Sequence, residues 1–178
     1  MRIFLLVLLT LGMLCGCAQT APPDYLAYQS QAMTVEADFT LNGETFPGTL
    51  TLAAAAFDEA GRMLARDAAL TIDGSIISGV TFEITGGEAC ISSGVLRIPL
   101  ADESVVTGIR ALISLFCIDP AAYHSAEPEG DLTRVTYTDG DNRVVMLWNP
   151  ETELPTAITA EIDGKTIAAE ISNIRNSA

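Results

Sequence analysis

Apolar and polar residues alternate with a period of two along much of this chain. The first clear run is Met33 to Leu41, where five apolar residues alternate with threonines and acidic residues. Strict alternation predicts a β-strand with one buried and one solvated face. Asn42-Gly43 follows at once, a strong signal for a two-residue hairpin turn. The alternation resumes over 49–54, so we expect a first hairpin here.

Further short apolar runs follow at regular spacing and are separated by Gly, Asp and Asn residues. We expect additional strands over 63–72, 80–85, 88–92, 95–100, 132–138, 143–148, 156–162 and 166–171. Short strands joined by tight turns predict an antiparallel meander. A long sheet tends to curl, so the expected fold is mainly β (α+β): a curved antiparallel sheet, or half-barrel, of about nine to eleven strands.

One segment departs from this period. Its apolar residues recur at steps of three and four: Val105, Ile109, Leu112, Ile113 and Phe116. With an acidic start and Asp119-Pro120 as a stop, this pattern predicts an amphipathic helix over about 103–118 that covers the apolar face of the sheet. We also expect a short N-terminal helix over 25–31. The polar stretch 121–130 is interpreted as a loop.

The N-terminal residues have the composition of an export signal. Arg2 precedes an apolar run over 3–14, which is short of the roughly 20 residues that a membrane-spanning helix needs. Leu14-Cys15-Gly16-Cys17 is similar to the lipobox of bacterial lipoproteins, which implies cleavage after Gly16 and lipid on the Cys17 thiol. The alternative is an ordinary cleaved signal peptide. We therefore expect a signal peptide over 1–16, a flexible tether over 17–24 and a single domain over 25–178.

The net charge of the chain bears on the kinds of molecule that it can bind. The chain carries 23 acidic against nine basic residues, a net charge of −14, and Lys165 is its only lysine. Such a surface repels nucleic acid, so we expect no nucleic-acid partner. Lipid on Cys17 would hold the protein on the outer face of the bacterial cell membrane, since two or three acyl chains anchor firmly.

Two cysteines belong to the expected domain, Cys90 and Cys117. A disulfide between them is compatible with export. The alternative is two buried thiols, because free cysteine packs like a small hydrophobic residue.

The sequence offers little catalytic or metal-binding chemistry. The lone histidine, His124, stands beside Ser125 and near Asp119, but a triad needs three groups that converge from separate elements. Asp139-Gly140-Asp141-Asn142 is rich in oxygen ligands yet lacks the spacing and closing glutamate of a calcium loop, and is better interpreted as a hairpin turn. We predict no enzyme activity, no catalytic residue, no metal and no cofactor.

The order of elements resembles a known superfamily. A helix, many antiparallel strands, an inserted helix, the run Val144 to Pro155 and then Ile162-Asp-Gly-Lys165 are similar to the lipoprotein carrier and receptor (LolA/LolB-like) half-barrels. This resemblance implies a sheet wrapped around an apolar cavity that holds acyl chains under helical lids. The carriers are free in the periplasm, and the arginine that latches their lid has no counterpart here, so transfer activity is not carried over.

Large apolar residues on the strands and helix are the candidate lining of such a cavity. They are Phe39, Leu41, Leu50, Leu52, Phe57, Leu112, Phe116, Tyr137, Met146 and Trp148. The same residues would serve equally as a packed core. The sequence thus leaves two functions: a lipid-anchored binding protein for an acyl chain or other apolar ligand, or a closed-core structural or protein-interaction domain of the cell envelope.

Overall fold

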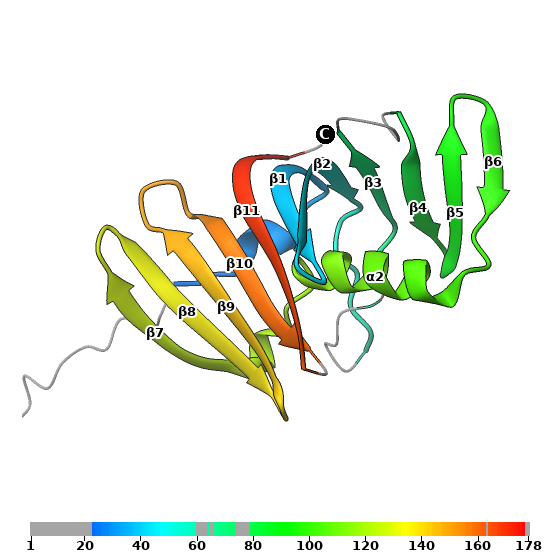
Figure 1. Ribbon diagram of the computed structural model, residues 1–178. Coiled ribbons are helices and arrows are strands. Elements are labelled where there is room, and N and C mark those ends of the chain that lie inside the picture. The colour runs from blue at the N-terminus through cyan, green and yellow to red at the C-terminus, as the bar shows by residue number, and fades with distance from the viewer. Residues whose placement is uncertain (1–22, 60–63, 65, 74–78, 163, 177–178) are drawn as a thin grey trace, which may run out of the picture.

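A computed structural model of the chain describes residues 23–59, 64, 66–73, 79–162 and 164–176. Within these residues eleven strands form one open antiparallel sheet, in the order β6-β5-β4-β3-β2-β1-β11-β10-β9-β8-β7 (Figure 1). The strands are β1 (Met33–Leu41), β2 (Glu44–Leu52), β3 (Ala68–Ile72), β4 (Thr81–Thr85), β5 (Glu88–Ser93), β6 (Leu96–Pro99), β7 (Tyr123–Glu129), β8 (Leu132–Asp139), β9 (Asn142–Asn149), β10 (Leu154–Ile162) and β11 (Lys165–Asn176). The helical elements are η1 (Ala27–Ser30), α2 (Glu103–Ser114) and η3 (Pro120–Ala122). The predicted sheet and its strand number are confirmed.

The sheet consists of two meanders that meet at its centre. The chain runs outward from β1 to the edge strand β6, crosses one face through α2 and η3, and returns inward from the other edge strand, β7, to β11. The first and last strands then pair along their length, from Met33 opposite Asn176 to Leu41 opposite Ile167. We call the face that α2 crosses the inner face and the opposite one the outer face.

The first hairpin forms as its turn residues predict. Asn42 and Gly43 both have positive φ, 54° and 83°, as a type I′ turn requires. The second strand begins at Glu44 and not near Thr49, because a two-residue turn returns the chain directly. Gly48 is required within this strand, since a Cβ there would lie 2.9 Å from the Thr71 carbonyl oxygen.

Helix α2 begins as expected and ends earlier than expected. The Asp102 carboxylate caps it by accepting from the backbone N–H groups of Ser104 and Val105. The α-helix stops at Ser114, and the following residues continue in tighter turns, with Phe116 N–H donating to the Ile113 carbonyl at 3.0 Å. Apolar spacing did not reveal this end because 115–118 remains largely buried after the helical hydrogen bonding changes.

Two other predictions need correction. The stretch 121–130, interpreted as a loop, contains η3 and the edge strand β7. Most of β7 is exposed, and among the described residues it pairs with β8 alone, so its sequence has no need of apolar alternation. The strand expected over 63–72 begins at Ala68, and residues 60–63 and 65 lie outside the described part. The expected short helix near the N-terminus is the four-residue η1.

A single hydrophobic cluster fills the space between the inner face, α2 and η1. Its fully buried sheet residues include Met33, Val35, Phe39, Leu50, Leu52, Val135, Met146, Ile158 and Ala169. From the other side, Leu112, Leu115 and Phe116 complete this core. On the outer face of β1, by contrast, the positions are polar: Thr34, Glu36, Asp38 and Thr40.

Buried polar groups tie η1 and the end of α2 to the sheet. Arg66 is only 5% exposed and donates to three backbone carbonyls, those of Ala53 (2.7 Å), Phe116 (3.2 Å) and Gln31 (3.0 Å). The Gln29 side chain accepts from the Ile118 N–H at 3.1 Å. These contacts join three segments that are remote in the sequence.

Candidate functional site

Most of the predicted cavity lining is packed core. Eight of the ten residues are buried, none more than 6% exposed: Phe39, Leu50, Leu52, Leu112, Phe116, Tyr137, Met146 and Trp148. They belong to one hydrophobic cluster that also includes residues of η1 and the segment before it. There the Tyr25 ring, two residues ahead of η1, meets the Trp148 ring edge-on with the ring centroids 5.1 Å apart. These eight residues therefore fill the centre of the inner face instead of surrounding an open cavity.

The other two predicted lining residues differ from this group. Phe57 is 49% exposed and lies in the connection between β2 and β3, away from the sheet core. Leu41, at the end of β1, is only partly buried and packs at the margin of the core. Three of the ten border an open space: Trp148 lines one of about 470 Å³ and Phe57 one of about 210 Å³, both beside η1. Leu41 lines the space between α2 and the sheet, which is the most apolar of the three.

That space is a groove of about 500 Å³ between the first half of α2 and the ends of three strands. Its apolar wall consists of Leu41 of β1, Ala111 of α2, Ile162 of β10 and Ile167 of β11. Gly108 completes the side formed by the helix. Its polar rim consists of Asn42, Glu103, Ser104, Thr107 and Lys165. We call this space the α2 groove.

The α2 groove depends on a close approach of helix to strand. A Cβ placed on Gly108 would lie 2.9 Å from Leu41 Cδ2. The glycine therefore lets Leu41 pack directly against the helix backbone. Further along the helix, the Arg110 side chain donates to the Gly87 carbonyl of the β4–β5 turn at 2.9 Å. Together these contacts position α2 across the strands near β1 and β5 (Figure 1).

The charges at the rim have different surroundings. Glu103 belongs to the first turn of α2, where the helix dipole favours a negative charge. Lys165 opens β11, and the structure shows no ion pair or hydrogen bond for it in any described part of the chain. Three arginines, in contrast, pair with carboxylates: Arg97 with Glu83, Arg134 with Glu129 and Arg175 with Glu36.

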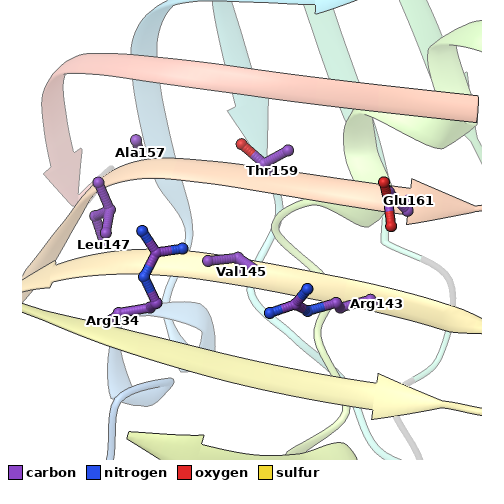
Figure 2. Close-up of a pocket in the computed structure, with 7 residues that line it drawn as sticks. All are labelled: Arg134, Arg143, Val145, Leu147, Ala157, Thr159 and Glu161. Carbon is purple, nitrogen blue, oxygen red and sulfur yellow. The ribbon is translucent and has the colours of Figure 1, made fainter. Parts of the chain in front are cut away.

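A second hollow, of about 310 Å³, lies on the outer face over β8, β9 and β10. Val145, Leu147 and Ala157 form its floor, and Figure 2 shows the guanidinium groups of Arg134 and Arg143 on either side of Val145. It is smaller and more polar than the α2 groove. Val145 and Leu147 of this floor come from β9, whose run Val144 to Trp148 is apolar on both faces, and Ala157 comes from β10.

The inner face is also apolar at the β6 edge. Leu96 is 57% exposed and Ile98 is 51% exposed, and Ile98 pairs with Ile91 on the same face. The adjoining turn residue Val95 is fully exposed. The described residues place no helix over this end of the sheet, which leaves an apolar patch open to solvent.

Cys90 and Cys117 are both free thiols in the structure, where Cys90 is buried and Cys117 is half-buried. Cys90 of β5 lies opposite Glu83 of β4, and its sulfur accepts a hydrogen bond from Arg97 Nε at 2.8 Å. Burial raises the pKa of the Cys117 thiol, and the nearby Arg66 guanidinium opposes that rise. The two sulfurs therefore have separate partners.

Asp119 and the turn 139–142 have structural roles. The Asp119 carboxylate accepts from the Ala121 N–H at 2.8 Å and so caps η3. His124 lies at the irregularity between Tyr123 and Ser125 in β7. Asp139 to Asn142 forms the β8–β9 turn, as interpreted from the sequence. In the described ranges no three His, Cys, Asp or Glu side chains are grouped to hold a metal ion.

Cys17, which we expect to carry lipid, and the expected signal peptide over 1–16 lie outside the described residues. Pro23 and Asp24 are described, and the Asp24 carboxylate accepts from the Leu26 N–H at 3.1 Å. No helix in the described part of the chain is long and apolar enough to cross a membrane.

No family model matches this sequence, and no curated protein does so either. Similar solved structures include MucB, with 16% identity and a TM-score of 0.47 over 87% of this chain and 57% of that one. A DUF1329 family protein from Desulfovibrio piger has 13% identity and a TM-score of 0.45, covering 87% and 89% of the two chains. A Vibrio parahaemolyticus domain named for outer-membrane lipoprotein sorting has 9% identity and a TM-score of 0.43, covering 87% and 90%. The present chain spans little more than half of the MucB chain.

Proposed function

We propose that this chain is an exported, lipid-anchored, non-enzymatic binding protein that holds an acyl chain or another apolar ligand in the α2 groove. The observation that carries the proposal is the open space beneath α2, on a sheet face whose centre is otherwise filled. Ligand pockets are mostly apolar clefts of about 300–1,000 Å³ with a few polar groups. The α2 groove fits that description and suits a single chain.

Lipid anchoring is supported by the sequence Leu14-Cys15-Gly16-Cys17. It would place the domain beside a membrane, where acyl ligands are abundant. Metabolic labelling with an alkyne analogue of palmitate tests this part of the proposal. The wild-type protein should take up the label, and Cys17→Ser should not. Label that persists in Cys17→Ser would contradict lipidation at this residue.

Ligand binding is tested with the Cys17→Ser protein and cis-parinaric acid, a fluorescent fatty acid. We expect saturable binding of one probe per chain and its displacement by palmitate. Gly108→Ala directs a methyl group at Leu41 and narrows the groove, so it should weaken binding. Helix propensity favours Ala over Gly by about 1 kcal/mol, so this change should not unfold the protein.

Val105→Leu is the matched control, since Val105 lies on the same helix, is partly exposed and does not line the groove. It should bind as the wild type does. If cis-parinaric acid shows no saturable binding to the wild-type domain, the ligand part of the proposal is wrong.

The second candidate function is a closed-core interaction domain of the cell envelope. It is favoured by the eight buried residues of the predicted lining and by the exposed apolar patch at β6. An envelope pull-down that recovers a stoichiometric partner with the wild type, and loses it with Leu96→Ser and Ile98→Ser together, would favour this function.

A further inference from the structure

We infer that Lys165 makes the α2 groove selective for acyl ligands with an anionic head, either the carboxylate of a fatty acid or the phosphate of a lipid headgroup. This inference rests on the proposed function and names its ligand class. It starts from the place of Lys165 at the rim of the α2 groove.

The register of β11 puts Lys165 on the inner face with the groove wall. Lys165 pairs with Ile162 of β10, and Ile167, two residues along β11, pairs with Leu41 of β1. Because side chains two residues apart in a strand share a face, Lys165 and Ile167 lie on the same side. A lysine can lay its aliphatic stem along an apolar wall and keep its ammonium in water. The ammonium is then available at the groove mouth.

Lys165 is one of two cations, with Arg143, that have no partner in the described structure. Acidic residues outnumber basic ones by 23 to nine, yet the sole lysine has no carboxylate or carbonyl partner in the described structure. A cation beside an apolar groove complements a ligand that is apolar along its length and anionic at one end. A charge-assisted hydrogen bond to such a head is stronger than one between neutral groups.

The surrounding charge makes this contact decisive. Glu103 lines the same rim, and the whole chain carries −14. The electrostatic potential of the whole protein therefore disfavours binding of an anionic ligand at the groove. Direct contact between the ligand head and the Lys165 ammonium is what favours such binding. Removing that ammonium should reverse the selectivity of the groove, so that a neutral head becomes the better ligand.

The test is displacement of cis-parinaric acid from the Cys17→Ser protein by three ligands of equal chain length: palmitate, hexadecyl phosphate and hexadecanol. We expect palmitate or hexadecyl phosphate to bind about five- to tenfold more tightly than hexadecanol. The better of the two anions identifies the head. In Lys165→Met this preference should be lost or reversed, and Lys165→Arg should retain it.

Arg143→Gln is the matched control for net charge. Arg143 is also a cation without a hydrogen-bond or ion-pair partner in the described structure, but it lines the hollow on the outer face. It should keep the wild-type preference. Equal affinity of wild type for all three ligands, or an unchanged preference in Lys165→Met, overturns the inference and leaves the proposed function standing. Failure of every ligand to bind would instead contradict the proposed function itself.

Discussion

At the scale of single residues, Arg66 stands out because its charged side chain is buried. It is buried without an ion pair in the described structure, and its three hydrogen bonds go to carbonyls of the β2 end, the N-terminal segment and the turn after α2. A guanidinium buried in this way keeps its charge, so the carbonyls must replace its hydration. Arg66 thus holds three segments that the chain brings together only on folding.

Arg66→Met should destabilise the protein by about 3 kcal/mol, because it leaves buried carbonyls without donors. Urea unfolding followed by circular dichroism measures the difference. Arg110→Gln is the control, since the exposed Arg110 side chain donates to the Gly87 carbonyl at the protein surface. It should change stability by no more than about 0.5 kcal/mol. Similar losses in both variants would contradict a special role for Arg66.

The sequence did not predict this role. Arg66 falls in the stretch 63–72, where apolar residues indicated a strand, and nothing in its neighbours marks a buried cation. Its partners are backbone carbonyls of remote segments, which carry no signal in side-chain chemistry. Leu41 shows the opposite case, because alternation along β1 correctly put it on the inner face.

At the scale of elements, α2 shows which features a sequence can predict. Its start was predictable because capping is local: Asp102 accepts from N–H groups two and three residues ahead. Its end was not, since the apolar residues after Ser114 stay buried in a different backbone conformation. Strand β7 was missed for the reverse reason, because an exposed edge strand has no apolar pattern to detect.

The cap makes the stability of α2 dependent on pH. The Ser104 hydroxyl, followed by the backbone N–H groups of Ser104 and Val105, lowers the pKa of Asp102 below its ordinary 3.8. A lowered pKa in the folded state contributes stability above the unfolded pKa, and this is lost as pH falls through the folded value. Asp102→Ala should therefore unfold at lower urea than wild type at pH 7.

This difference should shrink below about pH 4 and vanish once the carboxyl group is protonated. Urea midpoints measured from pH 2 to 7 give the comparison. Glu103→Gln, which removes a neighbouring charge without removing the cap, should show a smaller effect at pH 7. A deficit in Asp102→Ala that is constant over this range would contradict the role of the ionised cap.

At the scale of the whole molecule, the sheet depends on the pairing of β1 with β11. Each meander is held together by its own hairpins. The hydrogen bonds between β1 and β11 are what join the two meanders into one sheet. The α2 groove sits at the same place, since Leu41 and Ile167 form both a ladder pair and part of its wall. The meanders were predictable from local alternation. The groove was not, because it also requires Gly108 of α2 to meet Leu41.

A chain that ends at Gly164 should fail to fold cooperatively. It lacks β11, so β1 and β10 lose their shared neighbour and the core loses Ile167 and Ala169. Near-ultraviolet circular dichroism and urea unfolding should show loss of fixed tertiary structure and of a sharp transition. A chain that ends at Asn176 retains all of β11 and should behave like the full chain.

The central pairing also sets an order of events during synthesis. A chain that emerges N-terminus first presents β1 long before β11, with more than 120 residues between them. Until β11 arrives, one edge of β1 has its N–H and C=O groups free, and such an edge readily pairs with another chain. The middle of the finished sheet is thus the last part to close. Newly made molecules would be most prone to aggregation in that interval, and a chaperone that shields β1 would protect them best.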